Sequence, residues 1–80
     1  MDIKEWIEVK PDVMLGKPVI KGTRIPVELI VRKLGEGATL KDILDGYPNL
    51  TEEAVHAALI YAADAVADEK FIYLRTGTSN

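Results

Sequence analysis

Residues 16–27 constrain the fold of this 80-residue chain more than any other segment. They read Gly-Lys-Pro-Val-Ile-Lys-Gly-Thr-Arg-Ile-Pro-Val, so glycine and proline stand on both sides of short β-branched runs. Gly16 and Gly22 can adopt the positive φ that tight turns need, and Pro18, which lacks an N–H group, suits the start of a strand. Pro26 fits a first helical position. The segment therefore predicts a turn, a short strand, a second turn and a helix start.

The residues before this segment predict a β-hairpin. Residues 13–15 and 19–20 are apolar runs on either side of Gly-Lys-Pro, an arrangement typical of two strands joined by a short turn. Residues 3–9 alternate loosely between apolar and charged side chains, so we expect a short strand or a bent arm there. Residues 1–25 are thus expected to form a hairpin with an arm.

Three helices are predicted downstream. The first runs over about residues 26–34, where apolar side chains at i, i+3, i+4 and i+7 form one face. Thr39 begins the second as its N-cap, with Asp42 placed for a capping box, and Gly46 and the following proline end it. Thr51 caps the third, which is predicted over residues 52–68. Residues 26–68 are thus a three-helix bundle, and 69–80 are a C-terminal tail.

The third predicted helix is apolar nearly all the way round. Between His56 and Asp64 almost no polar face remains. Such a helix is usually buried on all sides, yet a chain this short buries only about 60 % of the surface that it exposes when unfolded. We therefore expect a second surface on this helix, either a homodimer seam or a groove for a partner. The seam is expected to include Ile60, Tyr61 or the apolar run of residues 71–74.

Three segments together resemble the domain of unknown function 433 family of bacteria and archaea. They are residues 16–27, Gly-Glu-Gly at 35–37 and Asp-Gly-Tyr-Pro-Asn-Leu-Thr at 45–51, and the resemblance extends over about residues 11–63. It implies a small helix-turn-helix module, homeodomain-like or winged-helix-like. It also implies the antitoxin of a type II toxin–antitoxin pair, with a PIN-like ribonuclease toxin as partner.

Charge is distributed unevenly along the chain. Residues 1–41 hold eight Lys or Arg against six Asp or Glu, a balance of +2, whereas residues 42–80 hold two against seven, a balance of −5. A basic half beside an acidic half suits one anionic and one cationic partner, although small proteins also carry uneven charge by chance.

The second and third predicted helices fit the helix-turn-helix plan, which a generic three-helix bundle shares. The third helix begins with Glu52 and Glu53 and has no Lys or Arg before Lys70, so we expect no base reading from it. Weak, salt-sensitive DNA binding would come instead from six basic residues elsewhere, namely Lys17, Lys21, Arg24, Arg32, Lys33 and Lys41.

Catalytic chemistry has few candidate residues. The chain has one histidine, no cysteine and a single serine, Ser79. His56 follows Glu52 by one helical turn, which is more often a surface pair than a ligand set. No residue spacing matches a metal site. We therefore expect no catalytic residue, metal or cofactor, and no enzymatic activity.

The expected fold class is α+β and mainly α, in one domain that forms a dimer. A cytoplasmic location is expected because no apolar run approaches the length of a membrane span. The favoured function, implied by the resemblance, is an antitoxin that neutralises a PIN-like ribonuclease toxin, with operator DNA as a possible further ligand. A stand-alone DNA-binding regulator and a dimeric scaffold with neither ligand are the alternatives.

The C-terminal part is the expected toxin-binding element. Acidic groups would face the basic rim of a ribonuclease cleft, and apolar groups would anchor in its walls. An alternative is that the apolar run completes a dimer core. The acidic residues are Asp64, Asp68 and Glu69, and the apolar ones are Phe71, Ile72, Tyr73 and Leu74.

Overall fold

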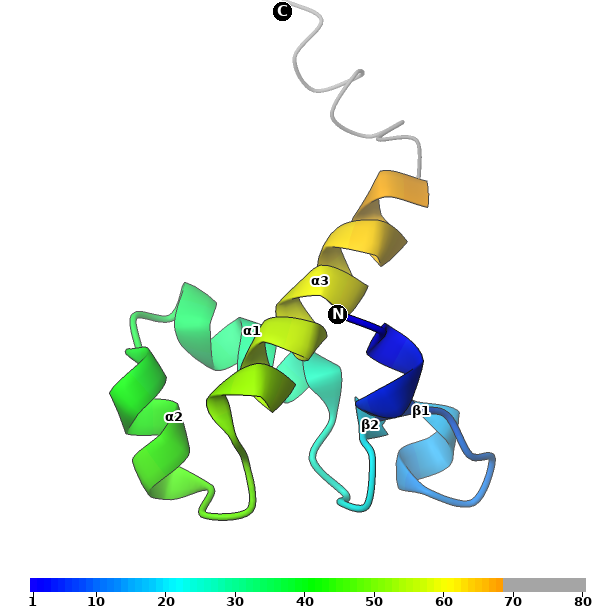
Figure 1. The fold of residues 1–80 in the computed structure, drawn as a ribbon, viewed down its shortest axis with the longest axis horizontal. Helices are drawn as coiled ribbons and strands as arrows, with labels where there is room; N and C mark the ends of the chain where they lie inside the picture. Colours follow the sequence, from blue (N-terminus) through cyan, green and yellow to red (C-terminus); the bar gives the residue numbers. More distant parts are fainter. Residues whose placement is uncertain (69–80) are drawn as a thin grey trace, which may run out of the picture.

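The computed structural model, which describes residues 1–68, consists of a two-stranded antiparallel sheet and three helices (Figure 1). This mainly helical architecture with a short N-terminal sheet confirms the fold class expected from the sequence. In chain order the elements are a 3₁₀ turn Ile3–Glu5, β1 (Ile7–Glu8), a 3₁₀ turn Met14–Gly16, β2 (Val19–Ile20), α1 (Val27–Gly35), α2 (Leu40–Gly46) and α3 (Glu52–Asp68).

The strand pairing differs from the hairpin that the sequence predicts. β2 pairs with β1, with Ile7 opposite Ile20, while residues 13–15 form no strand. Met14 and Leu15 adopt left-handed backbone conformations, with φ of 48° and 59°, and the Leu15 side chain is 93 % exposed. A left-handed residue cannot continue a strand, so the apolar run before Gly16 forms a turn and the partner of β2 comes from further upstream.

The turn after β2 is closed by its own side chains. The Thr23 hydroxyl donates to the Ile20 carbonyl oxygen over 2.8 Å and accepts from the Ile25 N–H over 3.0 Å. Gly22 has φ +80°, as its place in the turn predicts, and its N–H donates to the Glu8 carboxylate over 3.0 Å. The turn is thereby fixed to β1 as well as to itself.

The start of α1 lies one residue later than predicted. Pro26 is the N-cap, with an extended ψ of 145°, and not the first helical residue. It forms an isolated bridge with Val19, and the Val27 N–H donates to the Pro18 carbonyl oxygen over 2.9 Å. These contacts hold Pro26 in the extended conformation of the preceding loop.

The predicted caps of the other two helices are confirmed. Thr39 accepts from the Asp42 N–H over 3.1 Å, and the Asp42 carboxylate accepts from the Thr39 N–H over 2.9 Å, which completes the capping box. Because that carboxylate accepts from the Thr39 backbone and the Thr39 side chain donates to it, the pKa of Asp42 is lowered. At α3, the Thr51 hydroxyl oxygen accepts from the Ala54 N–H over 3.1 Å.

The core lies where α1, α2 and the first half of α3 meet. Ile30 of α1, Ile43 of α2 and Val55 of α3 are almost completely buried there, with Val19 of β2 equally inaccessible. Small residues on α3, such as Ala57 and Ala58, are fully buried and allow α1 to approach closely. The second half of α3 extends beyond this core (Figure 1).

Candidate partner-binding surface

Helix α3 changes from a core helix to an exposed apolar helix along its length. Its first half is anchored by the Thr51 cap and buried at Ala54, Val55, Ala57 and Ala58. Beyond them Leu59 is 39 %, Ile60 is 40 % and Val66 is 51 % exposed. The exposed part of the apolar pattern thus lies on the half of α3 that projects from the body (Figure 1).

An apolar groove of about 390 Å³ lies between α1 and this projecting half. Tyr61 and Asp64 come from the same part of α3, but Tyr61 lines the groove and is half-buried, whereas Asp64 is exposed and does not line it. Ile60 is also outside the groove lining. The lining residues are Pro18, Val27, Glu28, Val31, Arg32, Tyr61, Ala62, Ala65 and Val66.

One carboxylate with two cationic partners lies at this groove. The Glu28 carboxylate is 2.7 Å from the Lys17 ammonium nitrogen and 3.6 Å from Arg32 Nη2. The hydrogen bond and the charge of Lys17, followed by those of Arg32, lower the pKa of Glu28. One acid and two bases give this site a net charge of +1.

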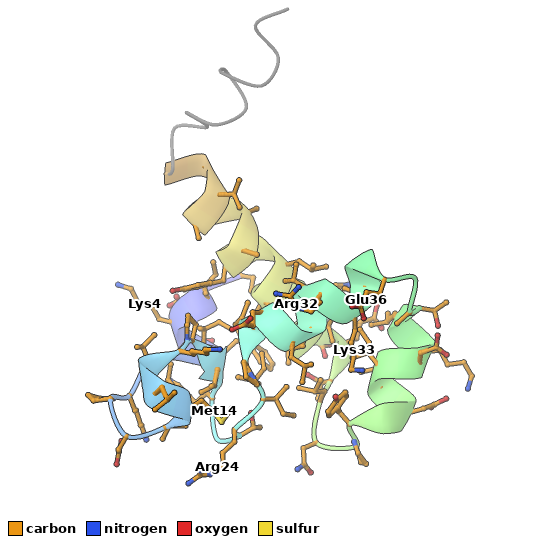
Figure 2. All side chains as sticks on the ribbon, turned by 180° about the vertical axis from the view of Figure 1, so that it is seen from behind. Lys4, Met14, Arg24, Arg32, Lys33 and Glu36 are labelled. Atoms are coloured by element: carbon orange, nitrogen blue, oxygen red, sulfur yellow. The ribbon has the colours of Figure 1, made fainter. Side chains whose placement is uncertain are left out.

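Three of the six predicted DNA contacts are held in ion pairs. Lys17 and Arg32 are paired with Glu28, and Lys41 is 2.6 Å from Asp45. The other three, Lys21, Arg24 and Lys33, have no ion pair with any residue of the described range 1–68. Arg24 extends away from the body on the turn before α1, while Arg32 and Lys33 come from α1 itself (Figure 2).

Within residues 1–68, the lone histidine is brought near one carboxylate. His56 Nε2 is 3.7 Å from the Glu52 carboxylate, and both side chains are exposed on α3. Among residues 1–68, no three His, Asp or Glu side chains are grouped so that they could hold a metal ion. No helix in that range is long and apolar enough to cross a membrane.

Sequence reasoning missed the α1 side of the groove. The apolar spacing of α1 predicts Val27 and Val31 only as members of its core-facing stripe, and it carries no signal for Glu28 as a groove residue. The i, i+4 spacing of Glu28 and Arg32 was the available signal for the ion pair. Asp68 is the last residue of α3, and the predicted contacts from residue 69 to residue 74 lie outside the described residues.

Comparisons with known proteins place the chain in a family. The family described as "Protein of unknown function (DUF433)" matches residues 7–62. An uncharacterized protein, y4eO, from Sinorhizobium fredii is 34 % identical over 59 residues, which are 74 % of this chain but 27 % of that protein. The chain thus spans about a quarter of the curated relative that it matches.

A solved structure agrees with both the sequence match and the fold. The crystal structure of a DUF433 member protein from Anabaena variabilis is 35 % identical, with a TM-score of 0.76 over 82 % of this chain and 65 % of that one. Because the family match covers more than half of the chain, this protein belongs to the DUF433 family.

Proposed function

We propose that this protein is the antitoxin of a type II toxin–antitoxin pair, and that it binds and neutralises a PIN-like ribonuclease toxin. The observation that carries the proposal is the projecting half of α3, which exposes Leu59, Ile60 and Val66 beyond the folded body. Exposed apolar side chains that gather on one element are typical of a protein-binding surface. The remainder of the proposal rests on the family resemblance.

The geometry fits a segment that enters a cleft. α3 is fixed to the core by its first half, so its second half is presented on a rigid base and loses little conformational entropy on binding. Leu59 and Ile60 would supply apolar anchors, and Asp64 is exposed beside them.

Charge supports the same partner. α3 contains no Lys or Arg, while Glu52, Glu53, Asp64 and Asp68 make it acidic. A ribonuclease cleft that holds RNA must be electropositive, so an acidic helix is attracted to it and association is accelerated.

Co-expression with the neighbouring ribonuclease gene tests this function. The full chain is expected to restore growth and to co-purify with the toxin. A chain ending at Asp68 is expected to lose at least part of the rescue, because it lacks the apolar residues 71–74. If the full chain neither binds nor rescues, the antitoxin proposal is wrong. If the shortened chain remains folded and rescues fully, residues 69–80 are not the neutralising element.

A stand-alone DNA-binding regulator is the second candidate. It is favoured by Lys21, Arg24 and Lys33, which have no ion pair within residues 1–68 and can therefore contact phosphates without breaking one. Base-specific contacts from α3 are not expected, because this helix has acidic residues and no Lys or Arg.

Salt dependence tests the DNA contacts. Replacing Lys21 or Lys33 with alanine is expected to lower the slope of log K against log salt by about 1 each, with no change in sequence preference. Lys41→Ala is the control, since Lys41 is already paired with Asp45. Equal slopes for all three variants and the unaltered protein would contradict these assignments.

A further inference from the structure

The groove between α1 and α3 is apolar, and residues 1–68 leave it open. Apart from Glu28 and Arg32 on its α1 side, the side chains that line it are apolar or aromatic. At the end nearest the end of α3, Val66 is 51 % exposed and Ala65 is exposed as well. Apolar surface of this kind is stabilised when another apolar group removes it from water.

An apolar segment follows α3 close to this open end. Ala65 lies within one helical turn of Asp68, the last residue of α3. The next apolar residues along the chain are 71–74, Phe-Ile-Tyr-Leu. A run of consecutive apolar residues rich in aromatic and β-branched side chains is typical of an extended segment and not of an amphipathic helix. The run is joined to α3 through residues 69–70 alone.

The length of this segment matches the α3 wall of the groove. Among the lining residues of α3, Tyr61 is the furthest from the helix end, at about 10 Å from Asp68 along the axis for a rise of about 1.5 Å per residue. Four extended residues span about 13 Å. Residues 71–74, running back along α3, would therefore reach from Val66 to Tyr61.

Phe71 stands at a position that commonly packs back onto a helix. Where the chain reverses after a helix, the third residue beyond the last helical one often contacts the third residue from the helix end. With Asp68 as the last residue of α3, these two positions are Phe71 and Val66. Because Val66 lines the groove, a contact between them would direct residues 71–74 into it.

We propose that residues 71–74 of the same chain fold back along α3 and cover the groove. Their short connection to α3 gives them an effective concentration of about millimolar, which a separate molecule does not reach at micromolar concentration. They carry no charge, so they enter the apolar groove without burying an unpaired charge. The proposal concerns the free chain and does not rest on the antitoxin function. If that function holds, the toxin and the groove compete for the same four residues.

The reactivity of single thiols in the full chain tests this contact. Since the chain has no cysteine, Ala65→Cys and Ala67→Cys each introduce one thiol. Both positions are exposed within residues 1–68, but only Ala65 lines the groove. Below micromolar concentration, the thiol of the first variant is expected to react with a maleimide at least about tenfold more slowly than that of the second, because residues 71–74 must leave the groove first. Equal rates would overturn the proposal.

A change in the segment itself identifies what covers the groove. Phe71→Asp and Tyr73→Asp together are expected to raise the rate of the Ala65→Cys variant to that of Ala67→Cys, and to leave the Ala67→Cys rate unchanged, since charged side chains do not enter an apolar groove. If the Ala65→Cys thiol remained protected after these changes, something other than residues 71–74 would cover the groove.

A disulfide shows whether the segment belongs to the same chain, and it does not depend on weakening the contact. Val31→Cys places a thiol on the α1 wall, and Tyr73→Cys places one in the segment. Oxidation of this double variant is expected to link them in a product of one chain, about 8.8 kDa. Ile60→Cys with Tyr73→Cys is the control and is expected to form no such link, because Ile60 lies outside the groove lining. A product of two chains only would mean that the segment comes from a second copy.

Discussion

Replacing Ile30 with alanine is expected to lower the free energy of unfolding by about 2–5 kcal/mol. Ile30 is 1 % exposed and lies on α1, which has more contacts with α3 than with any other element. The change removes three carbons from a site where α1 and α3 are packed together, and the helices can collapse around the cavity only in part. Since a domain of this size has a total stability of about 4–12 kcal/mol, the variant loses a large fraction of it.

Urea denaturation followed by circular dichroism measures this effect. The midpoint should fall by about 1 M or more, because the slope for a small domain is about 1–3 kcal/mol per M. Ile30→Val should cost about 0.5–1.5 kcal/mol. Leu15→Ala, at a side chain that makes little contact, should change stability by less than about 0.5 kcal/mol. Equal losses for Ile30→Ala and Leu15→Ala would mean that Ile30 is not in the core described here.

The helices were predictable from the sequence because their signals are local. Thr39 and Asp42 form a capping box within four residues, and Thr51 caps α3 through Ala54 three residues away. Such contacts depend only on spacing along the chain, so α2 and α3 begin at the predicted residues. Pro26 was placed one residue too far into α1 because its conformation is set by Val19, a residue outside the helix.

The strand pairing was not predictable in this way. Two short runs with apolar residues precede β2, namely residues 7–8 and residues 13–15. Periodicity alone does not show which of the two pairs with β2. Two features determine that β1 pairs with β2: the left-handed backbone at Met14 and Leu15, and the contact of β1 with α3. Both are properties of the folded chain, so no local pattern could identify them.

The candidate site was predicted in part. The apolar pattern of α3 indicated a second surface, and Ile60 is indeed exposed on it. The apolar pattern could not show that Tyr61 lines a groove while Ile60 lies outside it. This difference depends on how α1 packs beside α3, which is a property of the folded chain. The groove side and the Ile60 side of α3 are therefore two distinct surfaces of one helix.

Replacing Ile60 with lysine is expected to weaken toxin binding by about 30-fold, which corresponds to about 2 kcal/mol. This change removes an exposed apolar anchor and places a positive charge where the proposed partner is itself electropositive. The fold should be retained, because Ile60 is already 40 % exposed and the lysine stem can cover the same apolar surface while its ammonium group stays in water. Asp64→Asn should instead reduce the association rate, with a smaller effect on dissociation.

Binding kinetics with the purified toxin, rendered inactive, would measure both changes. Leu15→Lys is the matched control, since it makes an equal change of charge at an exposed apolar residue far from α3 along the chain. Sedimentation of Ile60→Lys should still give the mass of the unaltered protein, because this residue lies outside the groove. If Leu15→Lys weakened binding as much as Ile60→Lys, the effect would be one of net charge. If neither did, the toxin would bind to a surface other than the Ile60 side of α3.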